Sequence, residues 1–117
     1  MTWPGMAGAI TGMAPGRFSI TVNFVTHAED SSRTGLVARA VAGFWPVAWA
    51  VRRAFDECKT FKSAAKFLKS QYLLAPVLLT VVGTKNSERV VIECGCEDYW
   101  IREPEGTEPL LTTNHYA

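Results

Sequence analysis

An alternation of apolar and polar residues near the N-terminus constrains the fold of this chain more than any other feature. The alternating residues are Phe18, Ser19, Ile20, Thr21, Val22, Asn23 and Phe24. A period of two is typical of a β-strand with one apolar and one polar face. Ala14-Pro15-Gly16 precedes it and favours a tight turn, because Pro fixes φ and Gly tolerates positive φ. The sequence therefore predicts a hairpin over residues 9–24, with its polar face toward a cleft.

The middle of the chain changes to apolar spacings of three and four, which predict helices near 35–43, 46–57 and 61–71. Pro46 suits the first turn of the second helix, and Thr60 suits the N-cap of the third. Trp45 and Trp49 can line a ligand site, but their helical spacing favours core packing. Arg52-Arg53 can bind an anion, and a solvated helix face is the preferred interpretation.

Beyond Pro76 the pattern becomes that of strands again. Val77–Val82 is a nearly continuous β-rich run, as expected for a strand that is covered on both faces. Further strands are predicted over 88–94, 99–102 and 110–114. A hairpin followed by helices and then an antiparallel meander predicts an α+β fold, with an antiparallel sheet whose one face is covered by helices.

Composition excludes several functional classes. With 117 residues the chain is expected to form a single domain, 1–117. Its 12 basic and 11 acidic residues are scattered along the sequence, whereas a nucleic-acid-binding protein has a concentrated basic surface. The longest apolar run, 40–51, is too short to span a membrane and contains Pro46. No signal peptide pattern is expected at the N-terminus, and the sequence assigns no location. His27 falls in a polar segment and is interpreted as a loop residue.

Cys94-Gly95-Cys96 is the most conspicuous local motif. Two thiols one residue apart can bind a soft metal or form a redox pair, but no second Cys/His cluster supplies further ligands. A strand-end pair around a glycine bend is therefore preferred, and neither a metal nor a cofactor is predicted. Cys96 and His115 can also form a nucleophile pair, although no third residue to orient them is evident.

Two asparagines are candidate catalytic residues. Asn114 lies in Thr112-Thr113-Asn114-His115, at the end of a predicted strand, where its amide can donate to a developing oxyanion. Asn23 lies where the second hairpin strand gives way to a loop. An asparagine at such a position can equally be a turn former. The residues by themselves thus indicate two suggestive positions and no particular reaction.

Four segments, in order and at similar spacings, give the chain a family resemblance. From about residue 3 to 116 it resembles an inner part of the N-terminal-nucleophile linear amide hydrolases, which include choloylglycine hydrolase, penicillin V acylase, the acid ceramidase and acylethanolamine amidase branch, and related penicillin acyltransferases. The acid ceramidase and acylethanolamine amidase branch is the most similar. The segments are Gly5–Gly12, Pro15–Asn23, Leu74–Pro76 and Thr113–Tyr116.

The resemblance implies part of a four-layer αββα sandwich and hydrolysis of an N-acyl amide. In that family an N-terminal Cys attacks the amide carbonyl, and its own α-amine acts as base. Thr113-Asn114 looks like the segment that supplies the side-chain oxyanion donor. Val22-Asn23-Phe24 looks like the segment that supplies the backbone N–H donor. The implied substrate is an N-acyl amide with an apolar acyl chain against Trp and Phe side chains.

The chain also departs from the family pattern. Met1-Thr2-Trp3 stands at its start in place of a Cys, and the Arg and Asp that follow the family's nucleophile are absent. The chain alone is therefore expected to be inactive, to lack an N-terminal segment and to self-associate through uncovered sheet surface. Two functions remain open: a segment of an amidase or acyltransferase that carries the oxyanion residues, or a non-catalytic remnant or interaction domain with the same scaffold.

Overall fold

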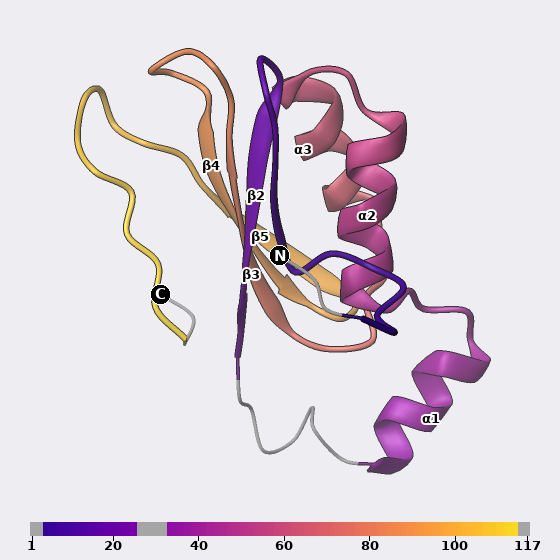
Figure 1. Cartoon of the computed structure of the whole chain (residues 1–117). Helices are drawn as coiled ribbons and strands as arrows, with labels where there is room; N and C mark the ends of the chain where they lie inside the picture. Colours follow the sequence, from indigo (N-terminus) through magenta and orange to yellow (C-terminus); the bar gives the residue numbers. More distant parts are fainter. Residues whose placement is uncertain (1–3, 26–32, 115–117) are drawn as a thin grey trace.

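Five antiparallel strands form one sheet, and two helices pack on one of its faces (Figure 1). This is a computed structural model, described for residues 4–25 and 33–114. Each strand pairs with the next along the chain, which confirms the predicted α+β class. The elements are β1 Thr11–Ala14, β2 Phe18–Phe24, α1 Arg33–Val41, α2 Val47–Glu57, α3 Phe61–Lys69, β3 Val77–Val82, β4 Arg89–Gly95 and β5 Asp98–Arg102.

The predicted hairpin is present as β1 and β2. Phe18 and Ile20 are buried toward the helices, as the alternation predicts. The ring of Phe18 stacks on that of Phe55 from α2, with 5.4 Å between the ring centroids. Gly12 makes room for this contact, because a Cβ at that position would lie 2.9 Å from the Phe55 ring. Phe24 is 49% exposed, since β2 extends beyond its pairing with β1, which begins opposite Thr21.

β3 occupies the centre of the sheet and is buried on both faces, as predicted. Leu79 belongs to the core between the sheet and the helices, and Leu78 belongs to a separate apolar cluster on the opposite side. Both side chains are fully buried. We call the face that carries Leu78, opposite α2 and α3, the second face of the sheet.

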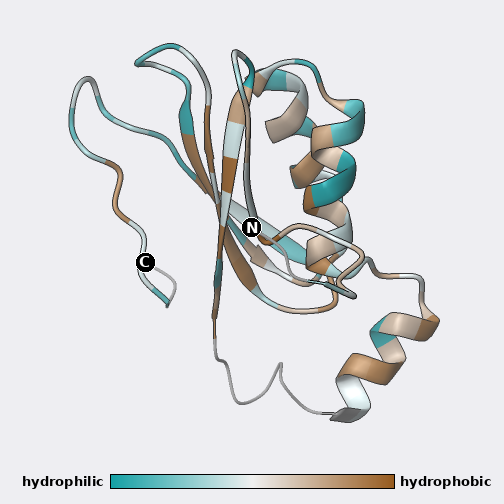
Figure 2. Cartoon of the chain, in the orientation of Figure 1, coloured by the Kyte–Doolittle hydropathy of each residue, from teal (hydrophilic) through white to brown (hydrophobic). Residues whose placement is uncertain are grey.

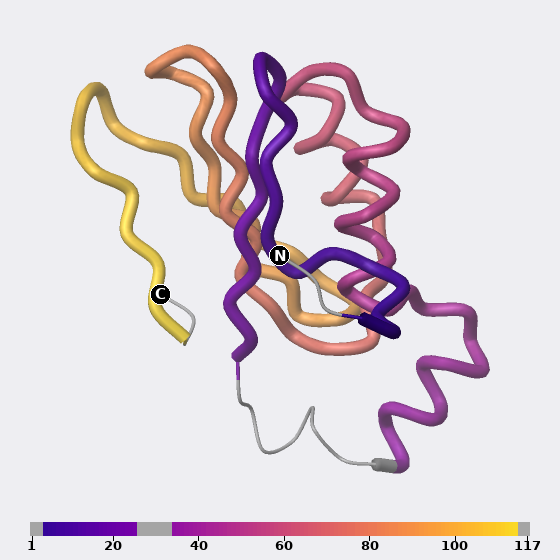
Figure 3. The backbone as a smooth tube through the Cα atoms, viewed as in Figure 1, coloured from indigo at the N-terminus to yellow at the C-terminus, as the bar shows by residue number. Residues whose placement is uncertain are grey.

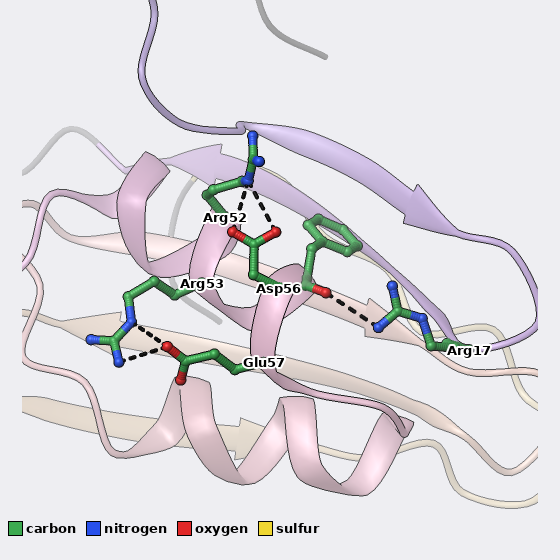
Figure 4. A network of polar contacts seen from close by, with 6 residues as sticks. Arg17, Arg52, Arg53, Asp56 and Glu57 are labelled. Carbon is green, nitrogen blue, oxygen red and sulfur yellow. Dashed lines mark hydrogen bonds and ion pairs between the residues drawn. The ribbon is translucent and has the colours of Figure 1, made fainter.

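The two packed helices follow their sequence signals closely. At the predicted N-cap of α3, the Thr60 hydroxyl accepts a hydrogen bond from the Ser63 N–H at 3.1 Å, and the Ser63 hydroxyl accepts one from the Thr60 N–H. On α2, Arg52 and Arg53 pair with Asp56 and Glu57 one turn later, so they form the predicted solvated face (Figure 4).

The aromatic pair around the start of α2 is divided between core and surface. Trp45 packs against the core, as predicted, whereas Trp49 is 48% exposed. The Arg53 guanidinium lies 4.9 Å from the centroid of the Trp45 ring, which is a cation–π distance. This contact covers the outer side of Trp45, so the Arg53 side chain lies at the boundary between the core and the surface.

Helix α1 projects away from the sheet and the other helices (Figure 1). Its apolar residues Leu36, Val37 and Val41 are exposed, and Figure 2 shows hydrophobic residues along this helix as well as in the strands. The Arg39 Nε donates to the Leu74 carbonyl at 3.1 Å and ties the helix to the chain before β3. Within the described part of the chain, no helix has the length and apolarity needed to cross a membrane.

The predicted strand over 110–114 is wrong. The structure has no strand there, and the segment passes over the second face of the sheet instead of joining an edge (Figure 3). The side chains of Arg102 and Asn23 contact its carbonyl groups at Leu111 and Thr113. These side-chain partners replace the backbone ladder that a further strand would have.

Arg17 links the hairpin to the C-terminal end of α2, and its loss is expected to destabilise the fold. Its Nη1 donates to the Phe55 carbonyl at 3.2 Å (Figure 4). The same Nη1 donates to the Cys58 carbonyl at 2.6 Å. Arg17→Met should lower the free energy of unfolding by about 1–3 kcal/mol, as for a charged hydrogen bond to a half-buried acceptor. Arg52→Met removes only an exposed ion pair and should cost less than about 0.5 kcal/mol. Urea unfolding of both variants checks this, and equal losses would contradict it.

Candidate active site

The end of β2 and the C-terminal segment of the described chain meet on the second face of the sheet. The Asn23 side-chain amide donates to the Thr113 carbonyl at 3.4 Å, across 90 residues of sequence. Asn23 is half-buried there, and Asn114 follows directly as an exposed residue in a bend. The structure therefore brings one predicted site residue against the immediate neighbour of the other.

A chain of polar contacts fixes the segment that leads to Asn114. Glu93 on β4 is buried and pairs with Arg102 on β5, with 2.5 Å between Oε1 and Nε. Arg102 Nη1 then donates to the Leu111 carbonyl at 2.8 Å. The hydroxyls of Thr80 and Thr112 lie 3.4 Å apart. Together with Asn23, these groups hold residues 111–113 at successive points across β5, β3 and β2.

An apolar contact supports the same segment. Leu110 packs against a small buried cluster on the second face. That cluster consists of Val25, Leu78 and Val91. Burial of apolar surface is the main favourable term in such packing, so Leu110 anchors the segment just before its polar contacts begin.

The strand register decides which backbone groups face the open edge of β2. The Val25 N–H donates to the Pro76 carbonyl at 3.3 Å, and bonding alternates along an antiparallel ladder. The N–H of Asn23, opposite Leu78, is therefore directed toward β3. The N–H of Phe24 is directed the other way, toward the edge where β1 no longer pairs. In this geometry the outward N–H at the end of β2 is that of Phe24, and Asn23 contributes its side chain.

The Glu93–Arg102 pair was not among the predicted site residues. A sequence signal for it exists, because Glu93 is a single acid inside the otherwise apolar run from Val90 to Cys94. A buried charge requires a partner, so such an acid indicates a paired cation nearby. The identity of that cation depends on the β4–β5 register, which places Trp100 directly opposite Glu93 and Arg102 two residues further along β5.

All three cysteines are buried in the described part of the chain. Cys94 and Cys96 are buried and not in a disulfide, and burial raises the pKa of the Cys94 thiol to about 12. Burial likewise raises the pKa of Cys58. Among the described residues there is no group of His, Cys, Asp and Glu side chains that could hold a metal ion. His27 and His115 lie outside the described residues. The predicted Cys96–His115 pair falls there too, because it includes His115.

The strand-end interpretation of the Cys motif agrees with the backbone, but the turn begins at Cys96 and not at the glycine, which is the last residue of β4. Cys96 has φ 65°, the left-handed region that a tight turn between β4 and β5 requires. Gly95 lies beneath the Trp100 ring, where an added Cβ would come within 3.4 Å of it. The motif is therefore the end of one strand and the start of a turn, with the Cys94 thiol directed into the core.

A cavity of about 520 Å³ lies at the opposite end of the β3–β4 hairpin from Asn23. It is lined by the turn residues between Val82 and Arg89 and by Gly106 and Thr107. The Arg89 guanidinium donates to the carbonyls of Gly106 and Glu108 and closes this end. The cavity is thus separate from the site around Asn23.

Comparisons with known proteins agree with this architecture. No protein-family model matches the chain. It is 28% identical over 123 residues to the N-acylethanolamine-hydrolyzing acid amidase of Mus musculus, and 30% identical over 122 residues to that of Oryctolagus cuniculus. These alignments cover 98% and 97% of the chain, which spans only 32% of the length of either relative.

A solved structure of similar fold is that of the Caenorhabditis elegans N-acylethanolamine-hydrolyzing acid amidase ortholog. Its TM-score is 0.75 at 22% sequence identity, over 89% of this chain and 44% of that chain. The fold of this chain is therefore similar to that of part of this acid amidase ortholog. The resemblance predicted from the sequence is confirmed: nearly the whole chain is similar to an inner segment of the acid amidases.

The raised pKa of Cys94 gives a test of its buried position. Because its pKa rises from 9.0 to about 12 on folding, the unfolded chain loses this proton first as the pH increases. The associated stability is complete below pH 9.0 and is lost as the pH rises through about 12. Relative to Cys94→Ala, the wild-type free energy of unfolding should fall as the pH rises above 9.0, by about 1.4 kcal/mol per pH unit at most.

The same burial should protect the thiol from reagents. Alkylation of native Cys94 by iodoacetamide at pH 8 should be much slower than in guanidinium chloride, because the thiolate is the reactive form. Peptide mass spectrometry distinguishes it from Cys58 and Cys96. Rapid native labelling of Cys94, or a stability difference that does not change with pH, would show that the thiol is accessible.

Proposed function

We propose that this chain supplies the oxyanion-binding part of an amidase that hydrolyses the linear amide bond of an N-acyl substrate. The observation that carries the proposal is the hydrogen bond from Asn23 to the Thr113 carbonyl, because it joins the end of β2 to the residue preceding Asn114. The names of the similar proteins suggest N-acylethanolamines as the substrate class. The proposed domain, 1–117, is a partial one, since it spans 32% of those relatives.

The proposed chemistry follows from amide hydrolysis. Attack of a nucleophile on the amide carbonyl places negative charge on its oxygen, and N–H donors fixed in advance stabilise that charge. In our proposal the Asn114 side-chain amide is one donor. The outward backbone N–H at the end of β2, on Phe24 beside Asn23, is the other. The amine then leaves, and water hydrolyses the acyl intermediate.

The nucleophile in this proposal comes from a segment outside the chain. The chain's own thiols are poor candidates, because all three are buried and the pKa of Cys94 is about 12. The family resemblance suggests an N-terminal Cys whose α-amine acts as base. Transfer of the acyl group to an acceptor other than water, as in the related acyltransferases, would use the same donors.

Loss of Asn114 gives the sharpest test of this function. In a version of the protein extended to carry the N-terminal Cys, Asn114→Ala should lower kcat for an N-acylethanolamine roughly a hundredfold or more, as loss of one oxyanion donor does. The KM should change much less, because the charge that Asn114 stabilises exists only in the transition state. Asn86→Ala, in the exposed β3–β4 turn, is the matched control and should leave both constants unchanged.

The chain alone should show no hydrolysis of N-acylethanolamines. If it does, and Cys96→Ser abolishes the activity, the nucleophile lies inside the chain and the proposal fails. If the extended protein is active and Asn114→Ala leaves its kcat unchanged, Asn114 is not the oxyanion donor. If the extended protein is folded and inactive on every N-acyl amide tested, the chain is a non-catalytic scaffold.

A further inference from the structure

The outermost strand β5 is an exposed sheet edge rich in large apolar residues. It is the last of the five strands in the sheet order. Tyr99 is 49% exposed, Trp100 57% and Ile101 38%. An edge strand presents backbone hydrogen-bonding groups to its surroundings and is a template for pairing with another strand. The described chain therefore ends its sheet on a surface suited to a further strand.

The register shows which backbone groups of β5 point outward. The Gly83 N–H donates to the Glu88 carbonyl at 2.7 Å, so even-numbered residues of β4 bond to β3 and odd-numbered ones bond to β5. Glu93 of β4 is opposite Trp100. The N–H and C=O of Trp100 therefore point inward, and those of its neighbours Tyr99 and Ile101 point away from β4.

We propose that two copies of this chain associate by antiparallel pairing of their β5 strands about Trp100. In this register Tyr99 of each copy exchanges both backbone hydrogen bonds with Ile101 of the other, because these are the residues whose groups point outward. The apolar side chains of Tyr99 and Ile101 then lie opposite each other on one face. The two Trp100 side chains meet on the second face.

Charge complementarity selects this register over its neighbours. Pairing about Trp100 puts Asp98 of each copy opposite Arg102 of the other. Arg102 uses its Nε and Nη1 within its own copy, and a guanidinium has further N–H donors. If the register shifted by two residues, either Asp98 or Arg102 of one copy would lie opposite Trp100 of the other. Asp98 and Arg102 would then no longer lie opposite each other. A shift by an odd number of residues would place Tyr99 or Ile101, whose N–H and C=O point outward, opposite residues whose N–H and C=O point inward. The hydrogen bonds between the two copies would then have no matching partners.

The other edge of the sheet is less suited to self-pairing. β1 has four residues, Thr11–Ala14, and carries no charged side chain. Its exposed apolar residue is Met13, at 74%. It offers a shorter ladder and no complementary charges to fix a register. The proposal therefore commits to β5 and to a second copy, and it is independent of the proposed amide chemistry.

Sedimentation equilibrium of the 117-residue chain over a concentration series tests the proposal. Wild type should approach twice the monomer mass with increasing concentration. Ile101→Pro removes an outward N–H without removing a bond to β4, so the variant should stay folded and sediment as a monomer. Asp98→Arg should weaken the dimer by like-charge repulsion. Glu97→Arg makes the same charge change in the exposed turn before β5 and is the matched control.

Cross-linking checks the register. Opposed residues of a non-hydrogen-bonded antiparallel pair have Cα atoms about 4.5 Å apart, which suits a disulfide. Trp100→Cys should therefore form a disulfide-linked dimer on mild oxidation, whereas Met13→Cys on β1 should not. A wild-type monomer at all concentrations, or a dimer unaffected by Ile101→Pro, would overturn the proposal. So would preferential cross-linking at position 13, or pairing of the edge only with a different protein.

Discussion

Burial of β3 on both faces is the constraint on which the rest of this structure depends. Leu79 packs toward the helices and Leu78 toward the second face, both fully buried. A strand in that position has no tolerance for a one-residue slip, because a slip would exchange its two sets of side chains. The register of β3 against β2 and β4 is thereby fixed. It in turn determines that Asn23 and Glu93 project onto the second face.

A buried ion pair also fixes the position of the segment that follows the last strand. Glu93 is a carboxylate within an apolar strand, and such a charge is tolerated only with a partner. Arg102 neutralises it and also donates to the Leu111 carbonyl, so one guanidinium serves both the sheet and the segment that crosses it. The path toward Asn114 is therefore set by a polar contact on the sheet surface, with Leu110 packed beneath it.

The proposed amide hydrolysis and the proposed association of two copies use different parts of the sheet. The amide site lies at the end of β2 and depends on the segment that crosses the second face. The proposed self-pairing uses β5, the opposite edge of the sheet from the β1–β2 hairpin. Arg102 belongs to both, because it pairs with Glu93 and stands opposite Asp98 in the proposed dimer. Association of two copies would therefore act on the support of the site while leaving the end of β2 uncovered.

The sequence by itself determined the local structure. The alternation of β2, the apolar run of β3 and the capping box at Thr60 each act through neighbouring residues, so their elements formed as predicted. Only the tertiary structure decided what depends on contacts between distant segments. Residues 110–114 have strand-like composition, yet they cross the sheet because Arg102 and Asn23 bind their carbonyl groups. The family resemblance implied a backbone donor in Val22-Asn23-Phe24, and bonding in a ladder alternates by register. That register, fixed by pairing across more than 50 residues, directs the N–H of Phe24 outward and that of Asn23 toward β3.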